Sequence, residues 1–172
     1  MRGSERFTQR ASTAIRKAHD AAAGMGHSYV GTEHILLGII REGEGLGARI
    51  LADNALTDSV LTRMVTETVG RGVPGTPEQG LSPRARHVIE LAAEDSNRLG
   101  HCYVGTEHLL IAIIEDGESF AVRFLQMLGV DPQSVANALS SALSDGYTVD
   151  KASGNAYPKD ENGEKEGGSA LE

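Results

Sequence analysis

The feature that most constrains this chain is an internal repeat with an offset of 74 residues. The segment YVGTEHILLGII (29–40) returns as YVGTEHLLIAII (103–114), and the preceding segment 7–27 aligns with 81–101 at the same offset. A repeat of this length corresponds to several helices in each copy. We therefore expect a tandem duplication of one multi-helix unit and not a solenoid of short repeats.

Apolar residues within each copy recur at steps of three and four, which predicts amphipathic helices. Thr8 and Ser82 are natural N-caps for the first helix of each copy, and Pro83 suits the first turn that follows Ser82. The second helices are expected to begin with Thr32 and Thr106 as caps. They are apolar almost all round, so each belongs at the centre of a bundle.

A third helix in each copy contains Leu46 or Phe120, and a fourth begins at Thr57 or Asp131. No segment alternates with period two for long enough to predict a sheet. The predicted fold is all-α, with eight helices in two four-helix units that form a pseudo-twofold domain. The expected boundaries are an N-terminal extension or tag remnant at 1–5, a first repeat at 6–70, a linker at 71–80, a second repeat at 81–146, and a flexible acidic linker at 147–172.

Composition excludes several classes of function. The net charge is −8, of which −3 falls on the last 23 residues, so the helical body is acidic and no nucleic-acid partner is expected. Cys102 is the single cysteine, which fits a reducing compartment. No stretch approaches the roughly 20 apolar residues of a membrane span, so no membrane partner is expected. The expected location is cytoplasmic.

Four motifs carry a resemblance to a known family: RFTQRA, VGTEHILLGIIREGEG, SPRARHVIELA and LGHCYVGTEHLL. They resemble the double-repeat N-terminal domain of Clp/Hsp100 AAA+ unfoldases, most closely the ClpC type, from Arg6 to about Asp145. The resemblance implies a non-catalytic receptor for substrates and for adaptors of the MecA type, serving a motor that feeds the ClpP protease. No GxxxxGK[ST] phosphate loop is present, so the chain is not itself the ATP-driven motor.

The same resemblance implies that the chain is an N-terminal fragment of an unfoldase, placed before an ATPase module, or a free-standing N-domain protein. A monomer is expected, because the ATPase modules of the family build the hexamer.

The ClpC resemblance also implies recognition of phosphoarginine, with one pocket in each repeat. The family's acidic and hydroxyl residues carry over to Glu33 and Thr8 in the first repeat and to Glu107 and Ser82 in the second. A carboxylate can hold the planar guanidinium, and a helix N-terminus can hold the phosphate. The resemblance also implies that each acid lies beside the hydroxyl of its own repeat, which the sequence alone does not show. The sequence departs from the family pattern at Ser82, usually Thr, and at Leu81, often aromatic.

A structural interpretation stays open beside this one. A glutamate at a helix start stabilises its own helix by about 0.3–1 kcal/mol and needs no ligand. In that case the domain gates the unfoldase without binding phosphoarginine. We expect Glu33→Ala to leave the fold nearly intact, because it removes an exposed contact worth about 1 kcal/mol or less, and a loss of several kcal/mol would favour the structural interpretation. Arg49 and Arg123, which recur on the third helices, are each expected to form an ion pair with a neighbouring acid.

Metal binding and catalysis are not expected. Each copy places two histidines about a helix junction, but zinc wants three or four converging ligands. We expect the histidines to satisfy backbone groups there; they are His27 and His34 in the first copy and His101 and His108 in the second. Adjacent Glu and His side chains point in different directions on a helix, so they form no catalytic dyad. No cofactor is expected.

Overall fold

The computed structural model describes residues 7–101, 103–117, 119–142, 147–149 and 156–158. These residues form eight α-helices and two short strands. The helices of the first copy are α2 (Gln9–Gly24), α3 (Thr32–Glu42), α4 (Leu46–Asp53) and α5 (Asp58–Thr68). Those of the second copy are α6 (Pro83–Arg98), α7 (Thr106–Asp116), α8 (Phe120–Met127) and α9 (Pro132–Ser141). The predicted all-α fold of duplicated helices is confirmed.

Most helices begin at the predicted capping residues. The side chains of Thr8 and Ser82 accept hydrogen bonds from the backbone N–H three residues ahead, and Thr57 and Asp131 cap α5 and α9 in the expected places. The prediction for α3 and α7 is wrong by one residue, because Gly31 and Gly105 occupy their N-cap positions. The threonines that follow are therefore free to bond elsewhere.

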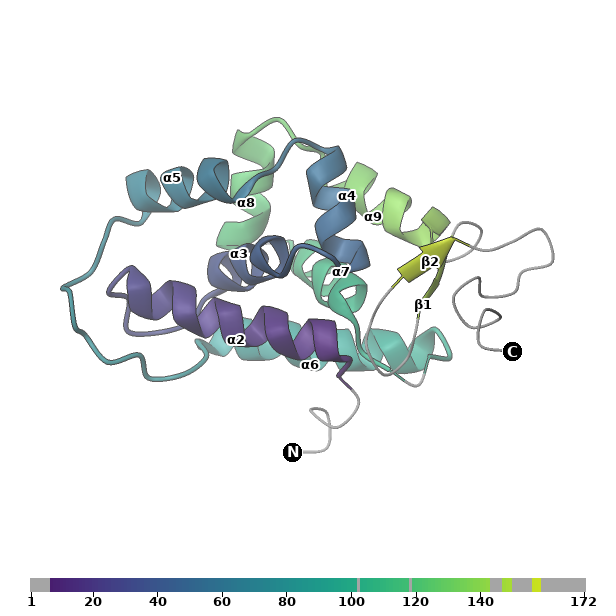
Figure 1. The fold of residues 1–172 in the computed structure, drawn as a ribbon, viewed down its shortest axis with the longest axis horizontal. Helices are drawn as coiled ribbons and strands as arrows, with labels where there is room; N and C mark the ends of the chain where they lie inside the picture. Colours follow the sequence, from purple (N-terminus) through teal and green to yellow (C-terminus); the bar gives the residue numbers. More distant parts are fainter. Residues whose placement is uncertain (1–6, 102, 118, 143–146, 150–155, 159–172) are drawn as a thin grey trace.

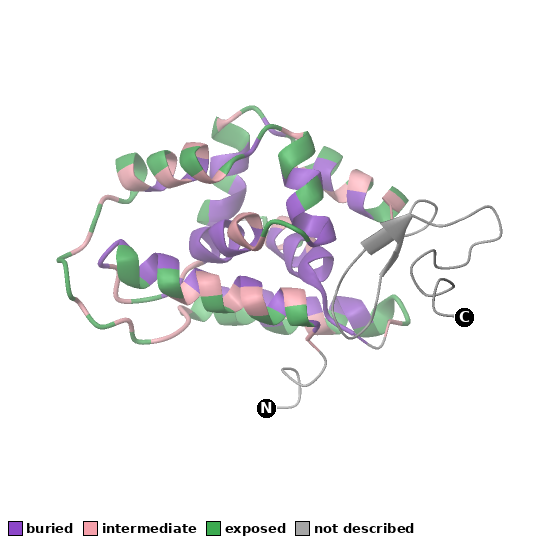
Figure 2. Ribbon diagram, in the orientation of Figure 1, coloured by how far each residue is buried: buried purple, intermediate pink, exposed green. Residues whose placement is uncertain are grey.

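The helices lie in three layers (Figure 1). Helices α2 and α6 form the lower layer of this view, α3 and α7 the middle, and α4, α5, α8 and α9 the upper. Buried residues concentrate on α3 and α7 (Figure 2), where Ile35, Leu36, Leu37 and Ile39 are fully enclosed. The prediction that these two apolar helices form the centre of the bundle is confirmed, and the reason is that they have no polar face to turn toward water.

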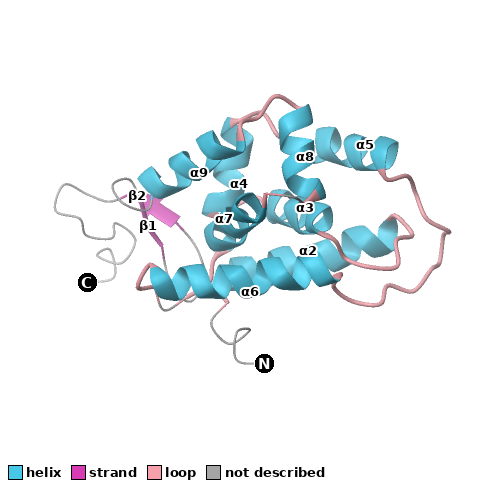
Figure 3. Ribbon diagram, turned by 180° about the vertical axis from the view of Figure 1, so that it is seen from behind, coloured by secondary structure: helices cyan, strands magenta, loops and turns pink. Residues whose placement is uncertain are grey.

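The two copies interlock, as the view from behind also shows (Figure 3). Helix α4 of the first copy packs on α7 and α9 of the second, and α8 of the second packs on α3 and α5 of the first. The backbone crosses between copies as well. The Thr8 N–H donates to the carbonyl of Val104 and the Ser82 N–H donates to that of Val30, each over 2.9 Å. The four-helix units therefore share one core.

Two three-residue strands follow the helices. Strand β1 (Tyr147–Val149) pairs antiparallel with β2 (Ala156–Pro158), within the segment that the sequence predicts to be a linker. Such short strands carry too few residues for a period-two pattern to be visible. None of the helices formed by the described residues is long and apolar enough to cross a membrane.

Candidate functional site

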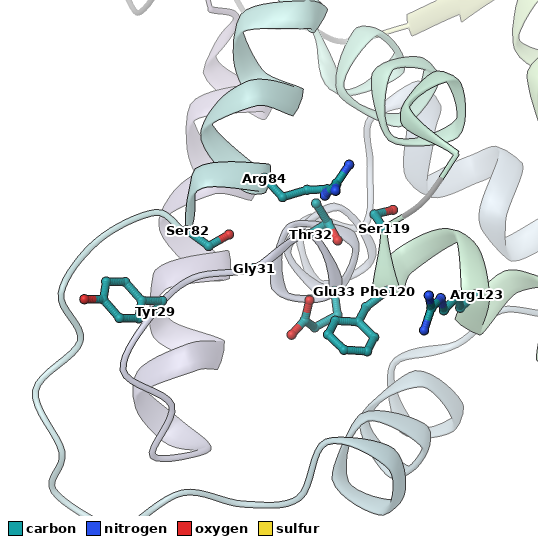
Figure 4. Close-up of a pocket in the computed structure, with 9 residues that line it drawn as sticks. All are labelled: Tyr29, Gly31, Thr32, Glu33, Ser82, Arg84, Ser119, Phe120 and Arg123. Carbon is teal, nitrogen blue, oxygen red and sulfur yellow. The ribbon is translucent and has the colours of Figure 1, made fainter.

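Three helix N-termini meet at a cavity of about 400 Å³ between the two copies (Figure 4). They belong to α3, α6 and α8, so each helix directs its free backbone N–H groups and the positive end of its dipole to the same region. Two arginines and one carboxylate add full charges. The residues lining the cavity are Tyr29, Gly31, Thr32, Glu33, Ser82, Arg84, Ser119, Phe120 and Arg123.

The predicted pairing of acid and hydroxyl within one repeat is wrong. Glu33 shares this cavity with Ser82 of the other copy. Thr8 instead joins the backbone at Val104, three residues before Glu107. This exchange of partners follows from the backbone hydrogen bonds between the copies. They hold the first helix of each copy against the GTEH loop of the other copy. Repeats in a sequence show which residues correspond, but not which copy supplies each partner.

The residues of the GTEH motif at the start of α3 make different contacts. The Glu33 carboxylate lies over Gly31, where a Cβ would stand only 2.5 Å from Glu33 Oε1. Glycine at position 31 therefore leaves room for the acid to turn back toward the helix start, and a larger residue would displace the carboxylate. The Thr32 hydroxyl accepts a hydrogen bond from the Ala121 N–H of α8 over 3.4 Å, which ties the second copy to the first. The His34 Nδ1 accepts from the Gly31 N–H over 2.8 Å and so caps α3.

The paired histidines form a chain of hydrogen bonds. Because His34 Nδ1 accepts from the backbone, its Nε2 must carry the proton, which it donates to His27 Nδ1 over 2.8 Å. His27 Nε2 then donates to the Gly70 carbonyl over 2.7 Å. Burial, together with the smaller effects of the charges on His27 and Arg41, lowers the pKa of His34 from 6.5 to about 4. The predicted role in satisfying backbone groups is confirmed for His27, His34 and His108.

Glu33 is only 6% exposed, so the expectation of a solvent-exposed carboxylate is wrong. Burial raises the pKa of Glu33, while a hydrogen bond from its own backbone N–H and the nearby His27 oppose the rise. A carboxylate that has lost much of its hydration gains more from a cationic guest than one on the open surface. If this glutamate only supported its helix, no ligand would offset the free-energy cost of its desolvation.

The cations and aromatic rings of the cavity were not identified from the sequence. Arg84 forms an ion pair with Asp116 at 3.0 Å, and the guanidinium of Arg123 lies 5.9 Å from the centre of the Phe120 ring. Tyr29 and Phe120 are 51% and 45% exposed, although the acid in the same cavity is buried. One signal was available for Arg84: it aligns with Arg10, which pairs in the same way with Glu42 at 2.8 Å.

The second glutamate of the repeat lies in a different environment. Glu107 is 1% exposed, and its Oε2 has no hydrogen-bond partner among the residues that the structure describes. Burial raises the pKa of Glu107, and hydrogen bonds from its own backbone N–H and from Tyr103 lower it by less. The resulting pKa is about 7, against an ordinary value of 4.5. Much of this carboxyl is therefore protonated at neutral pH. Among the described residues, no cluster of three or more His, Cys, Asp or Glu side chains could hold a metal ion.

The model of the Clp repeat (R) N-terminal domain matches residues 6–127 and 80–162. The chain belongs to this family. It is 40% identical over 149 residues to "Negative regulator of genetic competence ClpC/MecB" of Bacillus subtilis, a match covering 87% of this chain and 18% of that protein. It is 43% identical to the chaperone protein ClpB of Oceanobacillus iheyensis over 73% of this chain and 16% of that protein. The chain thus spans less than a fifth of these relatives.

Solved structures carry the same Clp repeat fold. The N-terminal domain of the chaperone ClpD from Arabidopsis thaliana superposes with a TM-score of 0.69 at 25% identity, over 81% of this chain and 96% of that one. The N-terminal domain of Hsp104 from Candida albicans gives a TM-score of 0.60 at 18% identity, over 77% and 88% of the two chains. The resemblance predicted from the sequence motifs is confirmed at the level of family and fold.

Proposed function

We propose that this Clp repeat domain is the substrate- and adaptor-receptor of a ClpC-type unfoldase of the ClpCP system. We further propose that the Glu33 cavity receives the phosphoarginine side chain of marked proteins. The observation that carries the second proposal is the meeting of one buried carboxylate with three helix N-termini. The ClpC/MecB relative, matched over most of this chain, supports the first. Adaptors of the MecA type are the proposed protein partners.

Phosphoarginine combines two groups that need opposite partners. Its planar guanidinium offers N–H donors on one side, and Glu33 can accept two of them in a bidentate arrangement. Its phosphoryl group carries negative charge, which suits the N-termini of α6 and α8, capped by Ser82 and Ser119. The exposed Phe120 ring beside Glu33 (Figure 4) adds a flat apolar face on which a guanidinium can stack.

The two arginines complete the selectivity for a phosphorylated ligand. Arg84 and Arg123 line the cavity with Glu33, and Arg84 is also paired with Asp116. An unmodified arginine would meet these cations without a phosphate to offset them, and inorganic phosphate would meet Glu33 without a guanidinium. We therefore expect the doubly functional side chain to bind more tightly than either half alone.

Titration of the chain with free phosphoarginine, followed by calorimetry and by amide shifts in NMR spectra, tests this proposal. We expect saturable binding in the wild type and a loss of affinity of about tenfold or more in Glu33→Gln, because a charged hydrogen bond contributes about 1.5–3 kcal/mol. Free arginine and inorganic phosphate are the matched control ligands. A wild-type chain that binds no phosphoarginine would refute the proposal that phosphoarginine is the ligand. The interpretation of the domain as a structural or gating one would then be preferred.

Adaptor docking needs a separate measurement, because it does not depend on phosphoarginine. Pull-down of a MecA-type adaptor by wild type and by Glu33→Gln would show whether the two activities share this cavity. The sequence prediction of a second phosphoarginine site at Glu107, which was paired there with Ser82, stays a prediction. The surroundings of Glu107 do not repeat those of Glu33.

A further inference from the structure

A second depression in the surface lies along α5 and is called here the α5 groove. It has a volume of about 670 Å³ and lies between the end of α3, the outer face of α5 and the first residue of the linker 71–80. In Figure 1 helix α5 lies at the outer edge of the upper layer, and the linker runs down the same side to α6. The α5 groove and the Glu33 cavity have no lining residue in common.

One arginine of the α5 groove is neutralised by the protein itself. Arg41 Nε donates to Asp58 Oδ2 over 3.0 Å, and Arg41 Nη2 donates to Asp58 Oδ1 over 3.3 Å. The same nitrogen donates to Thr62 Oγ1 over 3.2 Å, and the Thr62 hydroxyl donates to Asp58 Oδ1 over 2.8 Å. This network joins the end of α3 to α5, and it leaves neither charge for a partner.

The other two arginines of the groove are not neutralised in this way. Arg63 and Arg71 are exposed, and neither guanidinium forms an ion pair or a hydrogen bond within the part of the chain that the structure describes. Among the lining residues, Glu67 is the one acid that is not bound to Arg41. Two cations therefore face one acid in this groove, on a chain whose net charge is −8. A local excess of positive charge on an acidic protein attracts acidic ligands.

The second copy indicates that the fold does not need these arginines. At the offset of 74, Arg63 aligns with Asn137, and helix α9 contains no basic residue. The inward residues of the two helices do correspond, because all are buried: Leu61 and Val65 in α5, and Val135 and Leu139 in α9. The two copies therefore share the packing face of this helix, while the basic outer face belongs to α5 alone.

Two apolar side chains accompany the free cations. Val69 ends α5 and is 40% exposed, and Val73 in the linker is 71% exposed. They stand two residues before and two residues after Arg71 in the sequence. A partner that pairs acidic side chains with the arginines could also cover these valines with apolar side chains, which would add the hydrophobic contribution typical of protein interfaces.

We propose that the α5 groove docks an acidic peptide segment of a partner protein. Asp or Glu side chains of the segment pair with Arg63 and Arg71, and its apolar side chains cover Val69 and Val73. A peptide suits this surface better than a nucleic acid, because the phosphates of a nucleic acid would meet Glu67 and an acidic protein. The proposal depends neither on phosphoarginine nor on the Glu33 cavity.

Fluorescence anisotropy with the full chain and a labelled synthetic peptide of Glu, Leu and Gly residues tests this docking. The control peptide has Gln in place of Glu. We expect saturable binding of the acidic peptide that weakens as salt is added, because exposed charges are screened. The neutral peptide should bind about fivefold more weakly or worse, since it loses both ion pairs.

Two double variants with the same change in net charge locate the site. Arg63→Gln with Arg71→Gln removes both free cations of the α5 groove. Arg16→Gln with Arg86→Gln removes two exposed arginines of α2 and α6 that line neither the groove nor the Glu33 cavity. We expect the first variant to lose about fivefold or more in affinity for the acidic peptide and the second to stay within about twofold of wild type. Circular dichroism checks that both are folded.

The apolar part of the proposal has its own variant. Val73→Ser should bind the acidic peptide about twofold more weakly or worse, because less apolar surface is covered. Its matched probe is the peptide with Ser in place of Leu, which should bind Val73→Ser and wild type equally. Equal affinity of the two proteins for the leucine peptide would overturn the contact with the valines.

The remaining outcomes decide the docking itself. A loss confined to Arg63→Gln with Arg71→Gln would support the α5 groove. Equal losses in the two double variants would show that only net charge attracts the peptide, and would overturn the proposal. Equal binding of the neutral and acidic peptides would overturn it as well. Tighter binding of a single-stranded oligonucleotide than of the acidic peptide would overturn the choice of a peptide as the occupant.

Discussion

Replacing Gly38 with alanine should destabilise the domain by about 2–4 kcal/mol, although alanine is the better helix former. Gly38 lies in α3 where this helix crosses α2, and a Cβ there would stand 2.1 Å from the Ala14 carbonyl oxygen and 3.0 Å from the Ala18 nitrogen. Both partners are backbone atoms, so no side chain can turn aside. The helices must separate, and the gain of about 1 kcal/mol in helix propensity does not offset that cost.

Urea unfolding of Gly38→Ala, followed by circular dichroism, measures the effect. The second copy supplies a matched control, because Ala112 stands at the equivalent position of α7. Ala112→Gly should cost only about 1–2 kcal/mol, from lost helix propensity and a small cavity. A Gly38→Ala protein as stable as wild type would show that α2 and α3 do not cross as closely as described.

Replacing Glu107 with glutamine should stabilise the domain by about 3 kcal/mol at neutral pH and above, and by almost nothing near pH 4. The folded state raises the pKa of Glu107 from 4.5 to about 7, so the folded protein holds this proton more tightly than the unfolded chain does. The stability that protonated Glu107 contributes to the wild type is therefore fully present below pH 4.5 and is lost as the pH rises through 7. Glutamine has no proton to lose and avoids the loss.

Unfolding measured from pH 4 to 8 for wild type and Glu107→Gln checks both the sign and the window. His34 acts in the opposite direction, since its pKa falls from 6.5 to about 4 and its contribution is lost as the pH drops through that range. Between pH 4.5 and 6.5 the two groups offset one another in the wild type. The glutamine variant should therefore lose stability on acidification more steeply than wild type. Equal curves for the two proteins would contradict the burial of Glu107.

Much of the fold could be predicted because its signals are local. Helix periodicity, the caps at Thr8 and Ser82, and the all-round apolar character of the two central helices each depend on neighbours within a few residues. The repeat then showed that every helix occurs twice. The short strands at Tyr147–Val149 and Ala156–Pro158 were missed because three residues carry no visible period.

The site was only half predictable. The resemblance to the ClpC type implied ligand-binding roles for Glu33 and Ser82, but each was paired with the wrong partner, since the offset of 74 relates equivalent residues and not neighbours. Phe120 was predicted as an apolar helix residue and Arg123 as half of an ion pair, whereas both line the cavity. Their roles depend on where α8 meets α3, which is a long-range contact.

The sequence by itself determined that this protein is a duplicated, all-α Clp repeat domain with an acid at the start of each central helix. Those properties follow from short-range preferences and from a copied pattern. Only the tertiary structure decided that the copies exchange partners, that Leu46 and Glu107 are buried in one copy, and that Phe120 is exposed in the cavity of the other. Packing decides these points, because a difference of one β-carbon at a helix crossing changes which groups can reach each other and which can reach water.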